Sequence, residues 1–150
     1  MKYPQVLISD CNIKGILIKN DVIIIQFDEY GVFLQDKEGG KYERKKGIQL
    51  VLHGCSLENF EVQISHYIKK YSFLYFVNLL KRNIVLQRKY TFSFNESIIE
   101  MINNGNCTVS IVDEYYNISG GVWKFYYETK KERGIGTIEM KFEKAIFENF

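Results

Sequence analysis

The fold is decided by the segments Ile13-Lys-Gly-Ile-Leu-Ile18, Lys19-Asn20-Asp21 and Val22-Ile-Ile-Ile-Gln-Phe27. The first and third segments are rich in isoleucine, a β-branched residue that favours extended backbone. Two such segments joined by a few turn-forming residues are typical of a β-hairpin. Because Val22–Phe27 is nearly all apolar, we expect this strand in the middle of a sheet or covered on both faces.

Further strands are predicted after the hairpin. Residues 48–53 and 60–66 alternate between apolar and polar side chains, which indicates strands with one packed face and one solvated face. Residues 84–94 alternate in the same way, and Arg88 on their inward face would need a carboxylate partner. The intervening segment 36–47 is rich in glycine and charge, so we expect a solvated loop.

The last third of the chain predicts a meander of three strands. They lie near residues 107–113, 121–129 and 135–147, and glycine-containing turns separate them. The alternation of apolar residues changes parity after Glu143, which indicates a bulge or a bend.

One helix is predicted before the meander. Ser93-Phe-Asn-Glu96 has the form of a capping box, apolar residues then recur at helical spacing to Ile102, and Asn103-Asn104-Gly105 is typical of a left-handed stop. Residues 68–80 fit either a second helix or a buried strand, and the spacing favours the helix.

The composition agrees with this pattern. The chain has 150 residues with 46% hydrophobic and 15% aromatic side chains, and it contains one proline. This is the size of one domain, and neither a composition shift nor a repeat marks a boundary, so residues 1–150 are predicted to form a single domain. We therefore predict an α+β fold, in which a mostly antiparallel sheet of about eight or nine strands carries one or two short helices.

Composition also excludes several classes of protein. A net charge of +2 with 25% charged residues is ordinary for a folded domain, and no apolar run is long enough to cross a membrane. The apolar run near the start, Val6-Leu-Ile8, is too short for a signal peptide, so we expect a cytoplasmic protein. Three cysteines, Cys11, Cys55 and Cys107, fit buried reduced thiols better than a disulfide framework.

No pattern of catalytic or metal-binding residues stands out. His53, Cys55 and His66 lack the paired spacing of structural zinc sites, and His53 and Cys55 are poorly placed on one strand to act as base and nucleophile. The glycine pairs, such as Gly39-Gly40 and Gly120-Gly121, connect strands instead of opening a phosphate-binding helix. We therefore expect no catalytic residues, no metal and no cofactor, and a protein that is not an enzyme.

Nucleic acid is the alternative partner. Basic pairs recur along the chain, and aromatic side chains on an open sheet can stack on bases. The pairs are Arg44-Lys45-Lys46, Lys69-Lys70, Lys81-Arg82, Arg88-Lys89 and Lys130-Lys131. Neighbouring carboxylates, a pI of 8.3 and the inward parity of most aromatic residues argue against this partner.

The predicted partner-binding surface contains two clusters of acidic and aromatic residues. Asp113, Glu114, Tyr115 and Tyr116 precede a glycine turn, and Asp28, Glu29 and Tyr30 close the first hairpin. Tyrosine offers a large contact area at low entropic cost, and carboxylates steer a basic partner. Tyr115 and Tyr116 point to opposite faces if extended, so one of them can belong to the core.

Four segments carry a resemblance to a known class of protein: Asp10-Cys-Asn-Ile-Lys-Gly-Ile16, Ile25-Gln-Phe-Asp28, Gly54-Cys-Ser-Leu57 and Asp113-Glu-Tyr-Tyr-Asn117. With these segments and its size, the chain resembles small bacterial immunity proteins of toxin systems such as contact-dependent growth inhibition. The resemblance implies a cytoplasmic, single-domain, non-enzymatic protein. It also implies a cognate protein toxin as partner, whose active site is blocked by tight binding.

Overall fold

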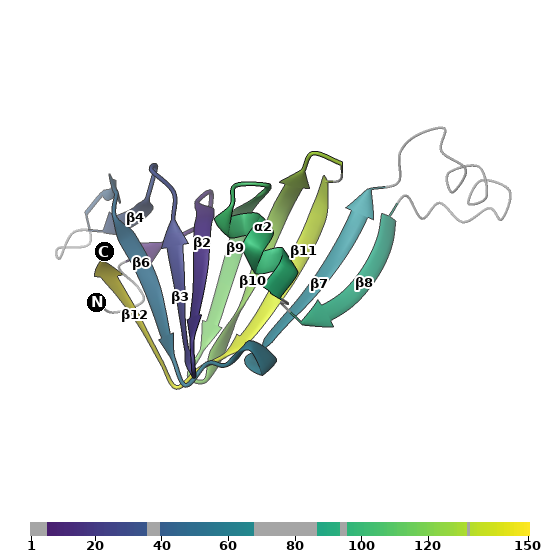
Figure 1. The fold of residues 1–150 in the computed structure, drawn as a ribbon. Helices are drawn as coiled ribbons and strands as arrows, with labels where there is room; N and C mark the ends of the chain where they lie inside the picture. The colour runs from purple at the N-terminus through teal and green to yellow at the C-terminus, as the bar shows by residue number, and fades with distance from the viewer. Residues whose placement is uncertain (1–5, 36–39, 68–86, 94–95, 132) are drawn as a thin grey trace, which may run out of the picture.

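The computed structural model describes residues 6–35, 40–67, 87–93, 96–131 and 133–150 (Figure 1). Within these ranges the chain is mostly antiparallel β, with one short helix, α2 (Glu96–Asn103), and a 3-10 turn, η2 (Leu57–Asn59). The strands are β1 (Val6–Leu7), β2 (Asn12–Lys19), β3 (Val22–Phe27), β4 (Val32–Gln35), β5 (Tyr42–Lys45), β6 (Ile48–His53), β7 (Phe60–Tyr67), β8 (Gln87–Ser93), β9 (Cys107–Asn117), β10 (Gly120–Thr129), β11 (Arg133–Lys141) and β12 (Lys144–Asn149). The predicted fold class is confirmed.

The strands form a main sheet and a small sheet. The main sheet has the order β12-β6-β3-β2-β9-β10-β11-β7-β8, and the small sheet has the order β1-β4-β5. The first hairpin is β2–β3, in which Lys19 pairs with Val22 across the turn. Asn20 adopts a positive φ of 53° in this turn, a conformation that asparagine tolerates better than most residues. β3 lies between β2 and β6, so its predicted place inside a sheet is confirmed.

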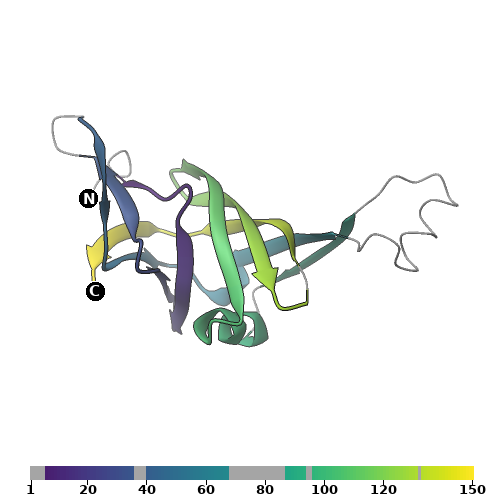
Figure 2. The same cartoon turned by 90° about the horizontal axis from the view of Figure 1, so that it is seen from above.

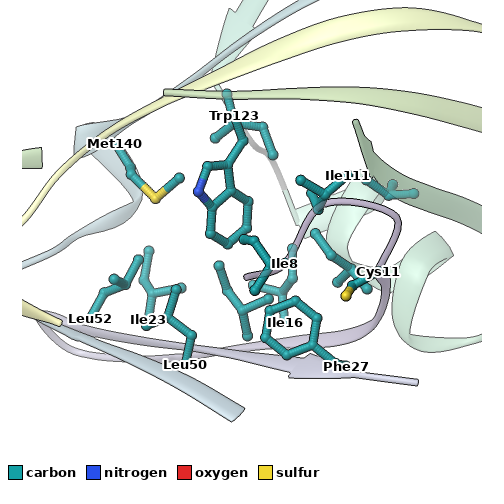
Figure 3. Packing of buried hydrophobic residues seen from close by; sticks show 14 of the residues in the cluster. Ile8, Cys11, Ile16, Ile23, Phe27, Leu50, Leu52, Ile111, Trp123 and Met140 are labelled. Carbon is teal, nitrogen blue, oxygen red and sulfur yellow. The ribbon is translucent and has the colours of Figure 1, made fainter. Parts of the chain in front are cut away.

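The core lies between two parts of the main sheet that face each other. Trp123 of β10 and Met140 of β11 lie on one side, Leu50 and Leu52 of β6 lie on the other, and Ile8 is inserted between them (Figure 3). All five side chains are buried. Seen from above, the strands do not lie in one plane, because the main sheet bends around this core (Figure 2).

The seam between these two parts is the short β2–β9 pairing. Only Asn12 with Ser110 and Ile13 with Val109 form ladder pairs there. Beyond them the side chain of Asn103, the last residue of α2, replaces a strand: its Oδ1 accepts the N–H of Ile16 at 2.7 Å, and its Nδ2 donates to the Ile16 carbonyl at 3.0 Å. The helix end therefore continues the hydrogen bonding of β2.

The predicted helix stop is confirmed. Gly105 has a φ of +72°, its N–H donates to Ile102, and the N–H of Asn106 donates to Met101. These two bonds form a Schellman motif, which satisfies the last carbonyls of the helix. Ile99 and Ile102 of α2 are buried in the core.

The structure differs from the sequence prediction in two connections. The segment 36–47 is predicted as a loop, but residues Tyr42–Lys45 form β5, whose side chains are all exposed because it pairs only with β4 at the edge of the small sheet. The strand predicted over 135–147 is two strands, β11 and β12. The parity change after Glu143 marks the point where the chain leaves β11 and crosses to pair with β6 at the far end of the main sheet.

Three expectations fall outside what the structure describes. The segment 68–80, predicted as a helix, lies outside the described residues, and so do Phe94 and Asn95 of the capping box. The Arg88 side chain is not described either, so its predicted carboxylate partner stays a prediction.

Candidate protein-binding surface

A β-bulge in β9 decides which residues of the first predicted cluster face outward. Lys124 of β10 pairs with Asp113, but the next residue, Phe125, pairs with Ile111, so Val112 is an extra residue on β9. An extra residue reverses the alternation of the strand beyond it. Cys107, Val109 and Ile111 face the core before the bulge, whereas Glu114 and Tyr116 face inward after it.

Asp113 and Tyr115 form the outward half of this cluster. The Tyr115 hydroxyl donates to Asp113 Oδ2 at 2.6 Å, and Lys124 Nζ lies 5.5 Å from the centre of the Tyr115 ring. The hydrogen bond from Tyr115, together with the nearby Lys124, holds the pKa of Asp113 below its usual value. The tyrosine is 53% exposed yet fixed in position by these contacts, so it offers solvent an ordered aromatic surface.

Glu114 and Tyr116 form the inward half and have structural partners. Glu114 Oε1 accepts the N–H of Ile8 at 2.6 Å, and Trp123 Nε1 donates to the Tyr116 hydroxyl at 3.1 Å. Burial raises the pKa of Glu114, although hydrogen bonds from the Ile8 backbone and from Tyr116 oppose the shift. Tyr116 packs against the core, which confirms that one of the two tyrosines belongs there.

The tip of the β9–β10 hairpin presents an apolar residue to solvent. Ile118 is 99% exposed. The turn around it is held by the Asn117 side chain, whose Oδ1 accepts the N–H of Ser119 at 2.9 Å, and by the Ser119 carbonyl, which accepts the N–H of Phe142 at 3.1 Å. Ile118 gains nothing from the fold at this position, because its side chain contacts water alone.

The sequence prediction did not include Ile118 in the site. The segment Asn117-Ile-Ser-Gly-Gly121 is interpreted there only as a turn. A β-branched apolar residue among turn-forming residues is the signal that was available, because such positions normally carry Gly, Asn, Asp or Ser.

A groove lies beside the hairpin tip. It has a volume of about 400 Å³ and is lined by Tyr116, Asn117, Gly121, Glu139, Lys141 and Glu143, among others. Gly121 is in close contact with the Tyr116 ring, because a Cβ atom there would lie 2.9 Å from Cδ1 of Tyr116. The tip and this groove form one continuous surface at the end of the hairpin.

The second predicted cluster also divides into structural and exposed residues. Asp28 is structural: its Oδ1 accepts the N–H of Tyr30 at 3.0 Å, and its Oδ2 accepts Nδ2 of Asn12 at 2.8 Å. Glu29 and Tyr30 are exposed. The Arg44 guanidinium lies 5.8 Å from the centre of the Tyr30 ring, so it contributes a cation–π contact on the small sheet.

The N-terminal segment lies between the two clusters. β1 pairs with β4 through Val6 and Leu7, then Ile8 donates to Glu114, and the N–H of Asp10 donates to the Ile111 carbonyl at 2.8 Å. The segment therefore joins the small sheet to β9, and the two clusters flank it.

The three cysteines are reduced and buried. Burial raises the pKa of the Cys11 and Cys55 thiols to about 11 and also raises the pKa of Cys107. A protonated, buried thiol is a poor nucleophile. Among the described residues, no three His, Cys, Asp or Glu side chains are grouped so that they could hold a metal ion.

The described basic pairs lie on separate elements. Arg44 and Lys45 belong to β5 of the small sheet, with Lys46 directly after it, and Lys130 and Lys131 lie in the β10–β11 turn. Lys69, Lys70, Lys81 and Arg82 lie outside the described residues.

No helix in the described part of the chain is long and apolar enough to span a membrane.

Comparisons with known proteins do not indicate a function, so the function is inferred from this geometry. No protein-family model, no curated protein and no solved structure matches the chain.

Proposed function

We propose that this protein is a non-catalytic binding protein of the cytoplasm, an immunity protein that neutralises a cognate bacterial toxin by tight binding and occlusion of its active site. One observation carries the proposal. Ile118 is held fully in solvent by an ordered turn, three residues after Tyr115, whose ring is also exposed and fixed. We define Asp113, Tyr115 and Ile118 as the hairpin-tip surface.

The hairpin-tip surface has the physical properties of a binding anchor. Burying an isoleucine side chain in a partner contributes about 1.5 to 3 kcal/mol, and an exposed tyrosine adds further apolar area. The backbone of the turn and the Tyr115 ring are held in position before binding, so less conformational entropy is lost on association. Fully exposed Ile118 contributes this free energy only when another molecule covers it.

The charges indicate the chemistry of the partner. The Asp113 carboxylate is ionised, because its pKa is held below the usual value, and Glu139 and Glu143 line the adjoining groove. Lys141 is the basic side chain in the same groove. A partner with an apolar pocket bordered by basic residues would fit this surface, and a toxin acting on an anionic substrate presents such residues at its active site.

The test compares partner capture by the wild-type protein and by the variant Ile118→Asp. Each tagged protein is expressed in its own cells and captured at low and high salt, and co-purifying chains are identified by mass spectrometry. We expect one stoichiometric protein with the wild type and its loss with Ile118→Asp. Leu17→Asp is the matched control, because Leu17 is a partly exposed apolar residue on β2, away from the hairpin tip.

The captured protein must then behave as a toxin. Its expression alone should arrest growth, and co-expression of the wild-type chain, but not of Ile118→Asp, should restore it. A captured protein that is harmless alone would refute the immunity function and leave only a binding function. Equal capture by the wild type and Ile118→Asp would remove the hairpin tip from the interface.

Nucleic-acid binding is the second candidate, and one observation favours it. Tyr115 and Tyr126 are exposed on the outer face of β9 and β10, and Lys124 lies between them along the sheet. Asp113 and Glu128 on the same face oppose a phosphate backbone. If this candidate is correct, affinity for single-stranded nucleic acid falls steeply with salt, and Lys124→Ala reduces the salt slope.

A further inference from the structure

β12 is an edge strand that the proposed function does not use. It pairs with β6 over Lys144–Asn149 without a break in register, and no described strand lies on its other side. It contains neither proline nor a bulge. Regular edge strands are templates for another strand unless charge or shape blocks them.

The backbone of β12 permits only certain pairing registers on this edge. The N–H of Phe150 donates to the carbonyl of Gly47, the residue opposite it, so even-numbered residues direct their backbone groups toward β6. Odd-numbered positions such as Ala145 therefore direct theirs toward the edge. A second antiparallel strand must pair odd positions with odd positions there.

The side chains of β12 are self-complementary in one such register. When two copies of β12 run antiparallel with Ile146 opposite Ile146, each Lys144 lies opposite the other copy's Glu148. The odd positions then face each other in the same arrangement, as the backbone requires. Opposite charges across a strand pair stabilise it, whereas like charges oppose it.

An apolar row on the outer face of the main sheet would continue across the twofold axis that relates the two copies of β12. Ile146 pairs with Val51 of β6, Val51 pairs with Ile24 of β3, and Ile24 pairs with Leu17 of β2. Gln49 with Glu148 borders the row on one side, and His53 with Lys144 borders it on the other. Joining two copies at Ile146 would make one uninterrupted apolar row across both sheets.

We infer that the chain forms a symmetric homodimer through antiparallel pairing of two β12 strands, centred on Ile146. Backbone direction permits this register, and charge and the apolar row select it. The partner is a second copy of the chain, because each β12 strand offers a Lys144 to the other copy's Glu148 and a Glu148 to the other copy's Lys144. The interface does not involve the hairpin-tip surface.

Charge exchange tests the register directly. Lys144→Glu places Glu opposite Glu in its own dimer, and Glu148→Lys places Lys opposite Lys. We expect each variant alone to dimerise about tenfold more weakly than the wild type. An equimolar mixture of the two variants should restore dimers, because each end of the mixed pairing then joins a glutamate to a lysine. Sedimentation velocity over about 1 to 500 µM measures each constant.

Ala145→Pro provides an independent test of the backbone pairing. The Ala145 N–H is directed at the edge, so proline removes a dimer hydrogen bond and leaves the β6 ladder intact. The variant should be monomeric with an unchanged circular dichroism spectrum. A monomeric wild-type chain at every concentration would overturn the inference, and so would a dimer that is unaffected by both single charge changes.

Discussion

The seam between the two parts of the main sheet predicts that Asn103→Ala lowers the free energy of unfolding. Asn103 makes two hydrogen bonds with the backbone of Ile16, at 2.7 and 3.0 Å, where the β2–β9 ladder has ended. Each bond contributes about 1 kcal/mol net, and both bonds are partly buried beside the core residue Ile16, whose backbone groups would lose their partner. We expect the free energy of unfolding to fall by about 2 kcal/mol.

Urea unfolding followed by circular dichroism measures this change, and Asn104→Ala is the matched control. Asn104 is the next residue and is exposed like Asn103, and both substitutions change asparagine to alanine at the same helix end. We expect the control to stay within about 0.5 kcal/mol of the wild type. If the two variants have equal stability, the Asn103 side chain does not replace a strand at this seam, and the reasoning is refuted.

Three further predictions concern the groups around the candidate surface. Because the pKa of Glu114 is raised in the folded state, its contribution to stability is fully present below the unfolded value of 4.5 and is lost as pH rises through the folded value. Glu114→Gln should therefore reduce the fall in the free energy of unfolding as pH rises above 4.5, and an unchanged pH dependence in urea unfolding would contradict this. Gly121→Ala should destabilise the protein by about 1 to 3 kcal/mol in thermal unfolding, because its Cβ would press on the Tyr116 ring, whereas Gly105→Ala meets no atom within 4 Å and adds only the strain of its positive φ. Cys55, with a pKa of about 11, should react with a thiol reagent at neutral pH only on unfolding, and fast labelling of the native protein would show that it is accessible.

Local features of the fold could be predicted from the sequence because local chemistry determines them. The hairpin Ile13–Phe27 follows from isoleucine-rich segments around an Asn-Asp turn, and the helix stop at Gly105 follows from the need for a left-handed residue. The crossing of β12 to β6 could not be predicted. The parity change after Glu143 signals a break in the strand, but strand order depends on contacts between residues far apart in the sequence.

The candidate site was predictable as a segment but not as a surface. The four residues Asp113–Tyr116 look equivalent in the sequence, yet the extra residue Val112 assigns alternate members to opposite faces. Nothing in the local sequence marks Val112 as the bulged residue, since valine is favoured in regular strands. Sequence reasoning therefore selected the strand, while the bulge decided which of its side chains face solvent.

This division separates the structural side chains from the exposed ones within one hairpin. Glu114 and Tyr116 connect β9 to Ile8 and Trp123, so their substitution would disturb the core before it tested any interface. Asp113 and Tyr115 are bonded chiefly to each other, and Ile118 is 99% exposed, so all three can be substituted without unfolding the chain. The proposed binding function would benefit from that independence, and β9 supplies it by directing its structural and its exposed side chains to opposite faces.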